Sequence, residues 1–224
     1  MPFRAGETLT YDVAWSTFLI AGSAVSRVVE KRPSYNSSAY YIVAEGRPIP
    51  IIARFYSVYY KMDSLLDSFT ALSQHTSTYQ EEGAKKRLAM TTFSRTTRRA
   101  QFEVQDEPAL KQEFTVPQNV QDGLATLYTL RARTFKPGER LSVPVADDGM
   151  LYTANFEVSG PEAVKVPVGE SEAWHLRITV LDAMNQPVGS NIAAWFSTDA
   201  RRLPLKLQAD LPVGTFVLAL RSVQ

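Results

Sequence analysis

The stretch ETLTYDVAW, residues 7–15, indicates the fold class because large apolar residues occupy every second position. These residues are Leu9, Tyr11, Val13 and Trp15. Successive side chains of a β-strand point to opposite faces, so this spacing places all four on one face. The stretch therefore predicts a strand with one buried and one solvated face, which is typical of an antiparallel sheet.

The same period of two returns later in the chain, in LYTANFEV (151–158), AWHLRITV (173–180) and RLPLKLQADL (202–211). Residues that favour tight turns separate the alternating segments, at Glu82-Gly83, Asp148-Gly149, Asn185-Gln186-Pro187 and Pro212-Val213-Gly214. Short turns of this composition join neighbouring antiparallel strands. The sequence therefore predicts a series of hairpins.

One segment, NVQDGLATLYTLRARTF (119–135), departs from this period. Its apolar residues stand three or four positions apart, at Val120, Leu124, Leu127 and Leu130. This spacing predicts one amphipathic helix near residues 119–133, packed on the sheet. Asn119 is available as its N-cap, and Pro137-Gly138 follows its end.

The composition fits one globular domain. The chain has 224 residues, of which 45% are apolar and 21% charged. All-β domains reach this size as single units, and no linker or internal repeat divides the chain. We expect one β-rich domain over residues 1–224. No apolar run approaches the roughly 18 residues of a membrane span, so we expect no transmembrane segment.

Several kinds of chemistry are excluded or disfavoured. The chain contains no cysteine, which rules out disulfides, thiolate metal sites and cysteine nucleophiles. His75 and His175 lack a second imidazole or a carboxylate at ligand spacing, so we expect ordinary strand histidines and no metal. No nucleophile elbow, P-loop or dinucleotide-binding motif is present. We therefore expect a protein that is not an enzyme and needs no cofactor.

The basic segment KKRLAMTTFSRTTRR, residues 85–99, raises the question of nucleic acid. The formal net charge of the chain is only +1, and Phe93 is the single aromatic residue in the segment. Binding of single strands needs aromatic side chains on which bases stack. We therefore interpret the segment as a solvated hairpin and expect no nucleic-acid partner.

The segment GRPIPIIARFYSVYYK, residues 46–61, is the best candidate for a binding site. Its second half reads as a strand with bulky residues on both faces, which is usually buried on both sides. Its first half contains Pro48 and Pro50 and suits a sheet edge or a loop with exposed isoleucines. Three interpretations stay open for this segment: plain core and edge packing, the lip of a ligand cavity, or contact with a membrane or partner.

Six blocks in this order resemble the bacterial family called domain of unknown function 3108. They are GETLTYDVAW (6–15), AGSAVSRV (21–28), FYSVYYKMDS (55–64), DGLATLYTLRAR (122–133), VPVGESEAWHLRI (166–178) and WFSTDARRLPLKLQADLPVGTFVLAL (195–220). The resemblance runs over nearly the whole chain. It implies an exported envelope protein, periplasmic or beyond, of largely antiparallel β structure, whose signal peptide is absent from this sequence. It also implies an architecture similar to the periplasmic lipoprotein carriers, in which a curved, incompletely closed sheet holds an acyl chain. It carries over no catalytic motif.

We expect an all-β fold of about ten to twelve antiparallel strands, strongly curved or forming an open half barrel, with the helix across one face. The leading functional hypothesis is non-enzymatic binding of an apolar or lipid-like ligand in the cell envelope. The alternative is a structural or assembly module that binds another envelope protein through a sheet edge or apolar loop, with no ligand cavity. An apolar cavity of several hundred Å³ would favour the first. The candidate ligand-binding residues are Ile49, Ile51, Ile52, Phe55, Tyr56, Tyr59, Leu124, Leu127 and Tyr128.

Overall fold

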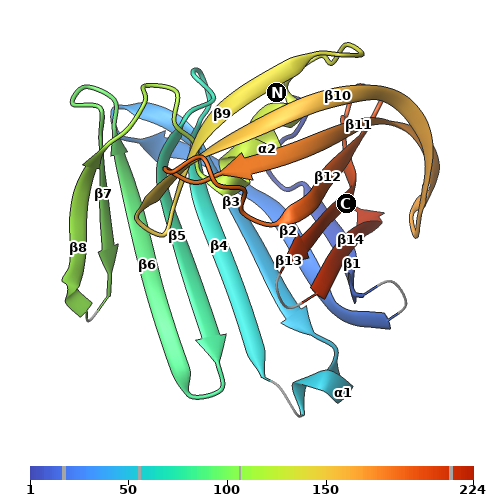
Figure 1. Cartoon of the computed structure of the whole chain (residues 1–224), viewed down its shortest axis with the longest axis horizontal. Coiled ribbons are helices and arrows are strands. Elements are labelled where there is room, and N and C mark those ends of the chain that lie inside the picture. Colours follow the sequence, from blue (N-terminus) through green and yellow to red (C-terminus); the bar gives the residue numbers. More distant parts are fainter. Residues whose placement is uncertain (17–18, 55–56, 106, 212–213) are drawn as a thin grey trace.

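The computed structural model describes residues 1–16, 19–54, 57–105, 107–211 and 214–224 (Figure 1). Two helices lie among the described residues, α1 (Pro50–Ala53) and α2 (Gly123–Arg131). The strands are β1 (Thr8–Trp15), β2 (Leu19–Ser34), β3 (Ser37–Pro48), β4 (Val58–Asp67), β5 (Ser73–Glu82), β6 (Lys85–Ser94), β7 (Arg99–Val104), β8 (Glu107–Thr115), β9 (Arg140–Asp147), β10 (Met150–Val166), β11 (Gly169–Leu181), β12 (Ser190–Ser197), β13 (Pro204–Leu211) and β14 (Gly214–Val223).

All fourteen strands belong to one antiparallel sheet of order β8-β7-β6-β5-β4-β3-β2-β1-β14-β13-β12-β11-β10-β9. The sheet is unclosed, and β8 and β9 form its two edges. The predicted fold class, an all-β curved antiparallel sheet of the open-barrel kind, is confirmed. The strands outnumber the ten to twelve expected because tight turns follow one another closely, as between β5, β6 and β7.

The first and last strands meet in the middle of the sheet. β1 pairs with β14 from Leu9↔Val223 to Trp15↔Phe216. At the start of β1, the Thr8 N–H donates to the Gln224 carbonyl at 3.0 Å, and the Gln224 N–H donates to the Thr8 carbonyl at 2.9 Å. This β1–β14 pairing joins the two hairpin series into one sheet.

The sheet curls strongly, and β9–β11 arch over its other half (Figure 1). Register shifts that mark β-bulges interrupt several pairs, including Val158/Gly160 within the long strand β10. Bulges bend a strand and increase its local twist, which is how a wide sheet curls without breaking. The tip of the β10–β11 hairpin folds back to β14, where the Val168 N–H donates to the Leu220 carbonyl at 3.0 Å.

Helix α2 lies inside the curl, in the connection between the two edge strands, and packs against β4 and β9. It begins later than predicted. Its N-cap is Asp122, whose carboxylate accepts from the Ala125 N–H at 2.8 Å, so the expectation of Asn119 is wrong. The reason is that Gln121 is held in a parallel bridge to Val145 of β9, which keeps the chain extended there.

The helix is also more enclosed than a helix laid across one face. Six of its nine residues are buried, namely Leu124, Ala125, Thr126, Tyr128, Leu130 and Arg131. Apolar side chains from the sheet surround it on several sides, including Val28, Ile42, Leu66, Phe156 and Phe196. The core therefore fills one end of the curled sheet around α2.

Two of the predicted turns show the expected backbone. Asp148 and Gly149 both have positive φ, 48° and 75°, between the paired residues Asp147 and Met150. This is the conformation of a two-residue type I′ hairpin turn. Gly83 likewise has φ 58° in the turn between β5 and β6. Pro212 and Val213 lie outside the described residues.

The segment 46–61 is partly different from its prediction. Pro48 ends β3 and pairs with Gly22 of β2, so the first half is neither a free edge nor a simple loop. The chain then forms the single turn α1, with Pro50 at its first position, where a missing N–H costs nothing. Strand β4 begins at Val58, and Phe55 and Tyr56 lie outside the described residues.

Candidate functional site

Contacts with α2 identify the inner face of the sheet. The hydroxyl groups of Tyr128 and Ser26 lie 2.8 Å apart, and the Ser64 hydroxyl donates to Asp122 at 2.6 Å. Ser26 and Ser64 therefore point toward the helix. Since side chains alternate along a strand, residues at even steps from them share this inner face.

Away from α2, the inner face of β1, β2, β13 and β14 is apolar. The register places six residues there, which we call the inner wall: Val13, Ala24, Leu207, Ala209, Phe216 and Leu218. All six are only partly buried. Apolar surface that its own neighbours leave partly exposed is available to a ligand.

The inner face of β4–β7 carries polar side chains beside buried apolar residues such as Phe93, Phe102 and Val104. A cleft of about 120 Å³ lies there, which we call the inner cleft. Its lining residues are Tyr60, Thr76, Thr78, Gln80, Arg87, Ala89, Thr91, Phe102, Asp147 and Asp148. Hydroxyl and amide groups dominate this lining, and such groups both donate and accept hydrogen bonds. The inner face thus has an apolar region on β1, β2, β13 and β14 and a polar cleft on β4–β7.

The turn between β9 and β10 closes one side of the inner cleft. The Arg87 guanidinium pairs with Asp148 at 2.5 Å, and the Gln112 side chain donates to the Gly149 carbonyl at 2.7 Å. Burial raises the pKa of Asp147, and the negative charge of Asp148 raises it further. Burial likewise raises the pKa of Tyr60, with Asp147 adding to the shift. The cleft therefore favours neutral hydrogen-bonding groups over further negative charge.

Exposed apolar side chains gather at the end of the sheet that carries α1. We call them the apolar rim: Trp15, Ile20, Ile51 and Leu211. They lie beside the β1–β2 turn, on α1 and beside the β13–β14 turn, and these elements share one end of the molecule (Figure 1). The Ile49 N–H donates to the Ala21 carbonyl at 2.9 Å, which ties α1 to β2 at this end.

The structure separates the predicted site residues. Ile49, Ile51 and Ile52 lie at α1, and Ile51 is 64% exposed. Leu124 and Tyr128 are buried in the core, where burial raises the pKa of Tyr128 to about 12.

The remaining predicted residues lie elsewhere. Leu127 packs against the core cluster around Phe156. Tyr59 lies on the outer face, with the Arg47 guanidinium 4.5 Å from its ring centre. Phe55 and Tyr56 lie outside the described residues. The isoleucines and the helix residues are therefore not brought together.

Sequence reasoning missed the inner cleft. The signal that could have found it is β5, SQHTSTYQEE, which is polar on both faces although both its neighbours in the sheet are strands. A central strand with Thr76, Thr78 and Gln80 on its inner face indicates a polar interior.

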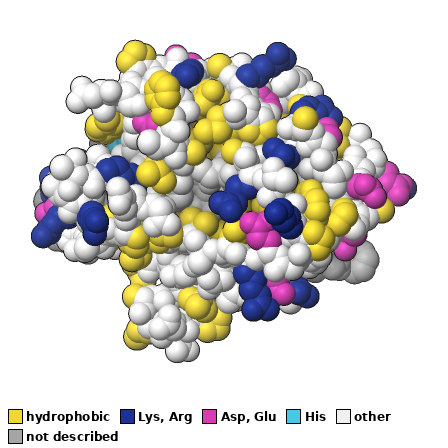
Figure 2. Space-filling view, turned by 90° about the horizontal axis from the view of Figure 1, so that it is seen from above, with side chains coloured by type: hydrophobic (Ala, Val, Ile, Leu, Met, Phe, Trp, Pro, Cys, Tyr) yellow, Lys and Arg dark blue, Asp and Glu magenta, His cyan; other side chains and the backbone are white. Residues whose placement is uncertain are grey.

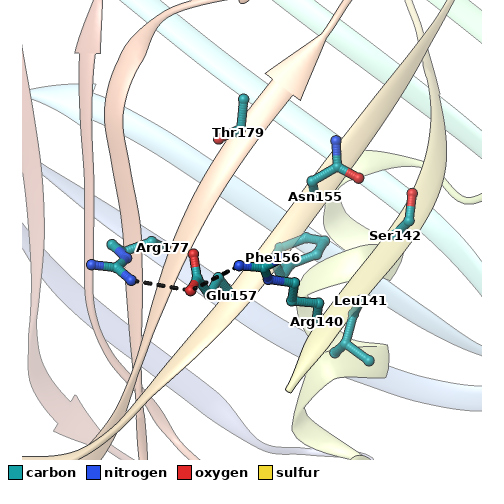
Figure 3. A pocket seen from close by; sticks show the side chains of 8 residues that line it. All are labelled: Arg140, Leu141, Ser142, Asn155, Phe156, Glu157, Arg177 and Thr179. Atoms are coloured by element: carbon teal, nitrogen blue, oxygen red, sulfur yellow. Dashed lines mark ion pairs between the residues drawn. The ribbon is translucent and has the colours of Figure 1, made fainter. Parts of the chain in front are cut away.

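A second and larger pocket, of about 430 Å³, lies on β9–β11 (Figure 3). The pairing register arranges six of its lining residues in two rows, Arg140–Glu157–Arg177 and Ser142–Asn155–Thr179. Both rows point away from the core cluster, because the intervening residues Leu141, Phe156 and Ile178 belong to that cluster. We call this the outer pocket. Seen from above, the surface carries positive, negative and apolar side chains close to one another, without a field of one charge (Figure 2).

The histidines lie on strands, as expected. His75 contacts the Thr92 hydroxyl at 3.1 Å, and burial lowers the pKa of His75. The His175 ring stacks on Trp195 with 4.5 Å between ring centres. Within the described ranges, no group of three or more histidine, aspartate or glutamate side chains could hold a metal ion. Neither helix in the described part of the chain is long and apolar enough to cross a membrane.

Comparison with solved structures places the fold among the β-barrel-like proteins. A protein of the domain of unknown function DUF1849 from Brucella abortus has a TM-score of 0.62 at 10% identity, with 99% of this chain and 98% of that chain covered. A Bacteroides fragilis protein with a YmcC-like fold, inferred to be exported, has a TM-score of 0.40 at 9% identity (100% and 97% covered). A Parabacteroides distasonis protein, inferred to be a lipoprotein, has a TM-score of 0.38 at 9% identity (100% and 98% covered).

The likeness to the DUF1849 protein, together with the unclosed sheet, defines the class as a half-open, β-barrel-like fold. The sequence profile described as protein of unknown function (DUF3108) matches residues 10–221. The chain therefore belongs to the DUF3108 family, and the resemblance of its sequence blocks to that family is confirmed. A search of the curated proteins found no match.

Proposed function

We propose that the protein is an exported, non-enzymatic binding protein for an amphipathic, lipid-like ligand of the cell envelope. One observation carries this proposal: the partly exposed apolar inner wall and the polar inner cleft lie on the same concave face. The part of the proposal that concerns export follows from what the resemblance to the family implies.

The size of the inner cleft and the apolar character of the inner wall suit different parts of the ligand. The inner cleft, at about 120 Å³, has room only for a small polar group. A hydrocarbon chain would instead lie along the inner wall, where each buried methylene contributes about 0.8 kcal/mol. A chain of about ten methylenes then contributes about 8 kcal/mol, which is comparable with the cost of association. The wall supplies affinity, and the cleft selects the polar group.

The test is uptake of a fluorescent fatty acid, together with native mass spectrometry of freshly purified protein. The variant Leu218→Ser places a hydroxyl on the inner wall, and we expect its affinity to fall about tenfold. The matched control is Val217→Ser, the next residue of β14, which points to the outer face and should bind as the original protein does. Circular dichroism verifies that both variants fold.

A second variant keeps the wall apolar. Ala24→Phe fills space on the inner wall without adding a polar group, so it should also reduce uptake. Equal uptake by all of these variants, or no uptake and no retained lipid in the original protein, would contradict the proposal.

The apolar rim supports a second candidate, an assembly module that binds another envelope protein. Ile51 is 64% exposed, and exposed apolar patches mark interaction sites. In that case Ile51→Glu would abolish association with the partner in crosslinked envelope extracts and leave fatty-acid uptake unchanged. If the rim is instead the entrance for the lipid, Ile51→Glu slows uptake.

A further inference from the structure

The outer pocket has the side chains of a site for a negatively charged group. Its first row places Glu157 between Arg140 and Arg177 on neighbouring strands. The Arg177 guanidinium lies 3.3 Å from Glu157 Oε1, and the Arg140 guanidinium lies 3.7 Å from the same oxygen (Figure 3). Two cations therefore share one carboxylate oxygen, and the row has a net charge of +1.

These ion pairs leave most of the arginine donors available. Each guanidinium has five N–H donors, and strong charge-assisted bonds are about 2.7–2.9 Å long. Both contacts are longer than that, and the side chains of Arg140 and Arg177 are 80% and 62% exposed. Glu157 thus holds the two guanidinium groups near each other without saturating them.

The second row adds neutral hydrogen-bonding groups. Ser142, Asn155 and Thr179 lie two residues along their strands from the charged row, on the same face. Among the described residues, none of their side chains makes a hydrogen bond to another part of the protein. They can therefore bind hydroxyl groups next to a charged group held by the arginines.

We propose that the outer pocket binds a phosphate group that carries a hydroxylated organic part. A phosphate offers several acceptor oxygens, so both arginines can donate to it at once. The volume of about 430 Å³ exceeds what a phosphate alone fills and lies within the range of small-molecule sites. The pocket lies on the opposite face from the inner wall, so this inference is independent of the proposed function.

The test is NMR titration of the intact protein at low ionic strength with inorganic phosphate and with glycerol 3-phosphate. We expect glycerol 3-phosphate to bind about three to ten times more tightly, because a side chain of the second row adds a hydrogen bond to a glycerol hydroxyl. Equal affinity for the two, or shifts spread over the surface instead of β9–β11, would overturn the proposal.

Three variants test the arginines and the shared carboxylate. Arg177→Gln should weaken binding of glycerol 3-phosphate at least tenfold. Glu157→Gln should strengthen it several-fold, because the competing carboxylate is gone. Arg221→Gln is the control, since Arg221 pairs with Asp12 on β1 and lies outside the pocket. If Glu157→Gln weakens binding, or Arg221→Gln acts like Arg177→Gln, the assignment is wrong.

Vesicles distinguish a free phosphate ester from a lipid headgroup. Binding to phosphatidylglycerol vesicles that Arg177→Gln abolishes identifies a lipid headgroup as the source of the phosphate. Binding to glycerol 3-phosphate without vesicle binding identifies a free ester. Equal binding to phosphatidylcholine and phosphatidylglycerol vesicles would contradict recognition by charge.

Discussion

At the scale of single residues, the most unusual feature is a buried ion pair at the end of α2. The Arg131 side chain is 0% exposed, and its guanidinium makes bonds of 2.5 and 3.0 Å to the two carboxylate oxygens of Glu7. The same group donates to the Arg201 carbonyl at 3.2 Å and lies 5.4 Å from the centre of the Phe3 ring. Glu7, next to β1, and the chain before β13 are thereby fixed to the helix.

Removing the carboxylate should cost more stability than removing the cation. Glu7→Ala leaves Arg131 charged and buried, and such broken pairs lose about 3–5 kcal/mol in the free energy of unfolding. Arg131→Met leaves Glu7, which is 11% exposed and closer to water, so we expect a smaller loss. Urea denaturation of both variants measures the difference. A larger loss for Arg131→Met would show that the pair acts mainly through packing of the arginine.

The buried Asp122 makes the stability of the folded protein depend on pH, and the direction of its pKa shift gives the sign of this dependence. Burial raises its pKa above the ordinary value of 3.8, although Ser64 and the Ala125 N–H donate to it and oppose the shift. A raised pKa in the folded state means that the contribution of this group to stability is greatest at low pH and is lost as pH rises through the folded pKa.

The variant Asp122→Asn tests this sign, since asparagine also caps helices well. The original protein should lose stability relative to Asp122→Asn as pH rises from about 4, until Asp122 is fully ionised in the folded state. Urea denaturation across that range at constant ionic strength gives the two curves. Parallel curves would contradict a raised pKa at this position.

At the scale of elements, the β9–β10 turn holds the two edges of the sheet near each other. A side chain on Gly149 would bring its Cβ closest to the Gln112 side chain of β8 and to 2.8 Å from the Phe102 ring of β7, and Gly149 also has φ 75°. The turn therefore needs glycine for two reasons, the left-handed backbone and the close approach to β7.

Gly149→Ala should lower the free energy of unfolding by about 2–5 kcal/mol, the sum of about 1–2 for the left-handed backbone and about 1–3 for overpacking. Gly83→Ala is the matched control: Gly83 has φ 58°, but its Cβ would meet open space, so only the backbone cost of about 1–2 kcal/mol applies. Thermal and urea denaturation compare the two. Equal losses would show that the contact with Phe102 contributes nothing.

The same elements show what local sequence could predict. The turns at Gly83 and Gly149 were predictable because left-handed backbone selects few residue types. The start of α2 was not, because Gln121 is held by β9 and by Ser73, which are far from it in sequence. The inner cleft was missed for a related reason. The cleft is lined by residues of β4–β7 together with Asp147 and Asp148, and local alternation does not show that the β9–β10 turn reaches those strands.

At the scale of the whole molecule, the β1–β14 pairing decides the topology of the sheet. No local pattern in the sequence predicts this pairing. Leu9 and Val223 are partners although they stand at opposite ends of the sequence. Alternation predicted four segments as amphipathic strands, yet amphipathic strands can pair in many orders. The apolar rim shares this limitation, since Trp15, Ile51 and Leu211 come together only through the sheet.

The pairing predicts that the chain tolerates circular permutation. Residues 8 and 224 exchange two backbone hydrogen bonds, so the N-terminal and C-terminal segments lie side by side. A flexible linker can therefore join residue 224 to residue 1. New ends between the exposed residues Gly83 and Ala84 should leave the far-ultraviolet circular dichroism and fatty-acid uptake unchanged. Ends between Asp148 and Gly149 should give a less stable protein, because that turn contacts β6–β8. A permutant at Gly83 that fails to fold would contradict this.

The meeting of β1 and β14 also bears on how the protein is made. Of the two partners of β1, β2 follows it directly in the sequence, whereas β14 (Gly214–Val223) is the last strand of the chain. A folding intermediate that has formed β1–β8 without β14 has β1 as an edge strand, with unpaired N–H and C=O groups of the kind that recruit other chains. A chaperone bound to β1 would protect such an intermediate from aggregation until β14 pairs.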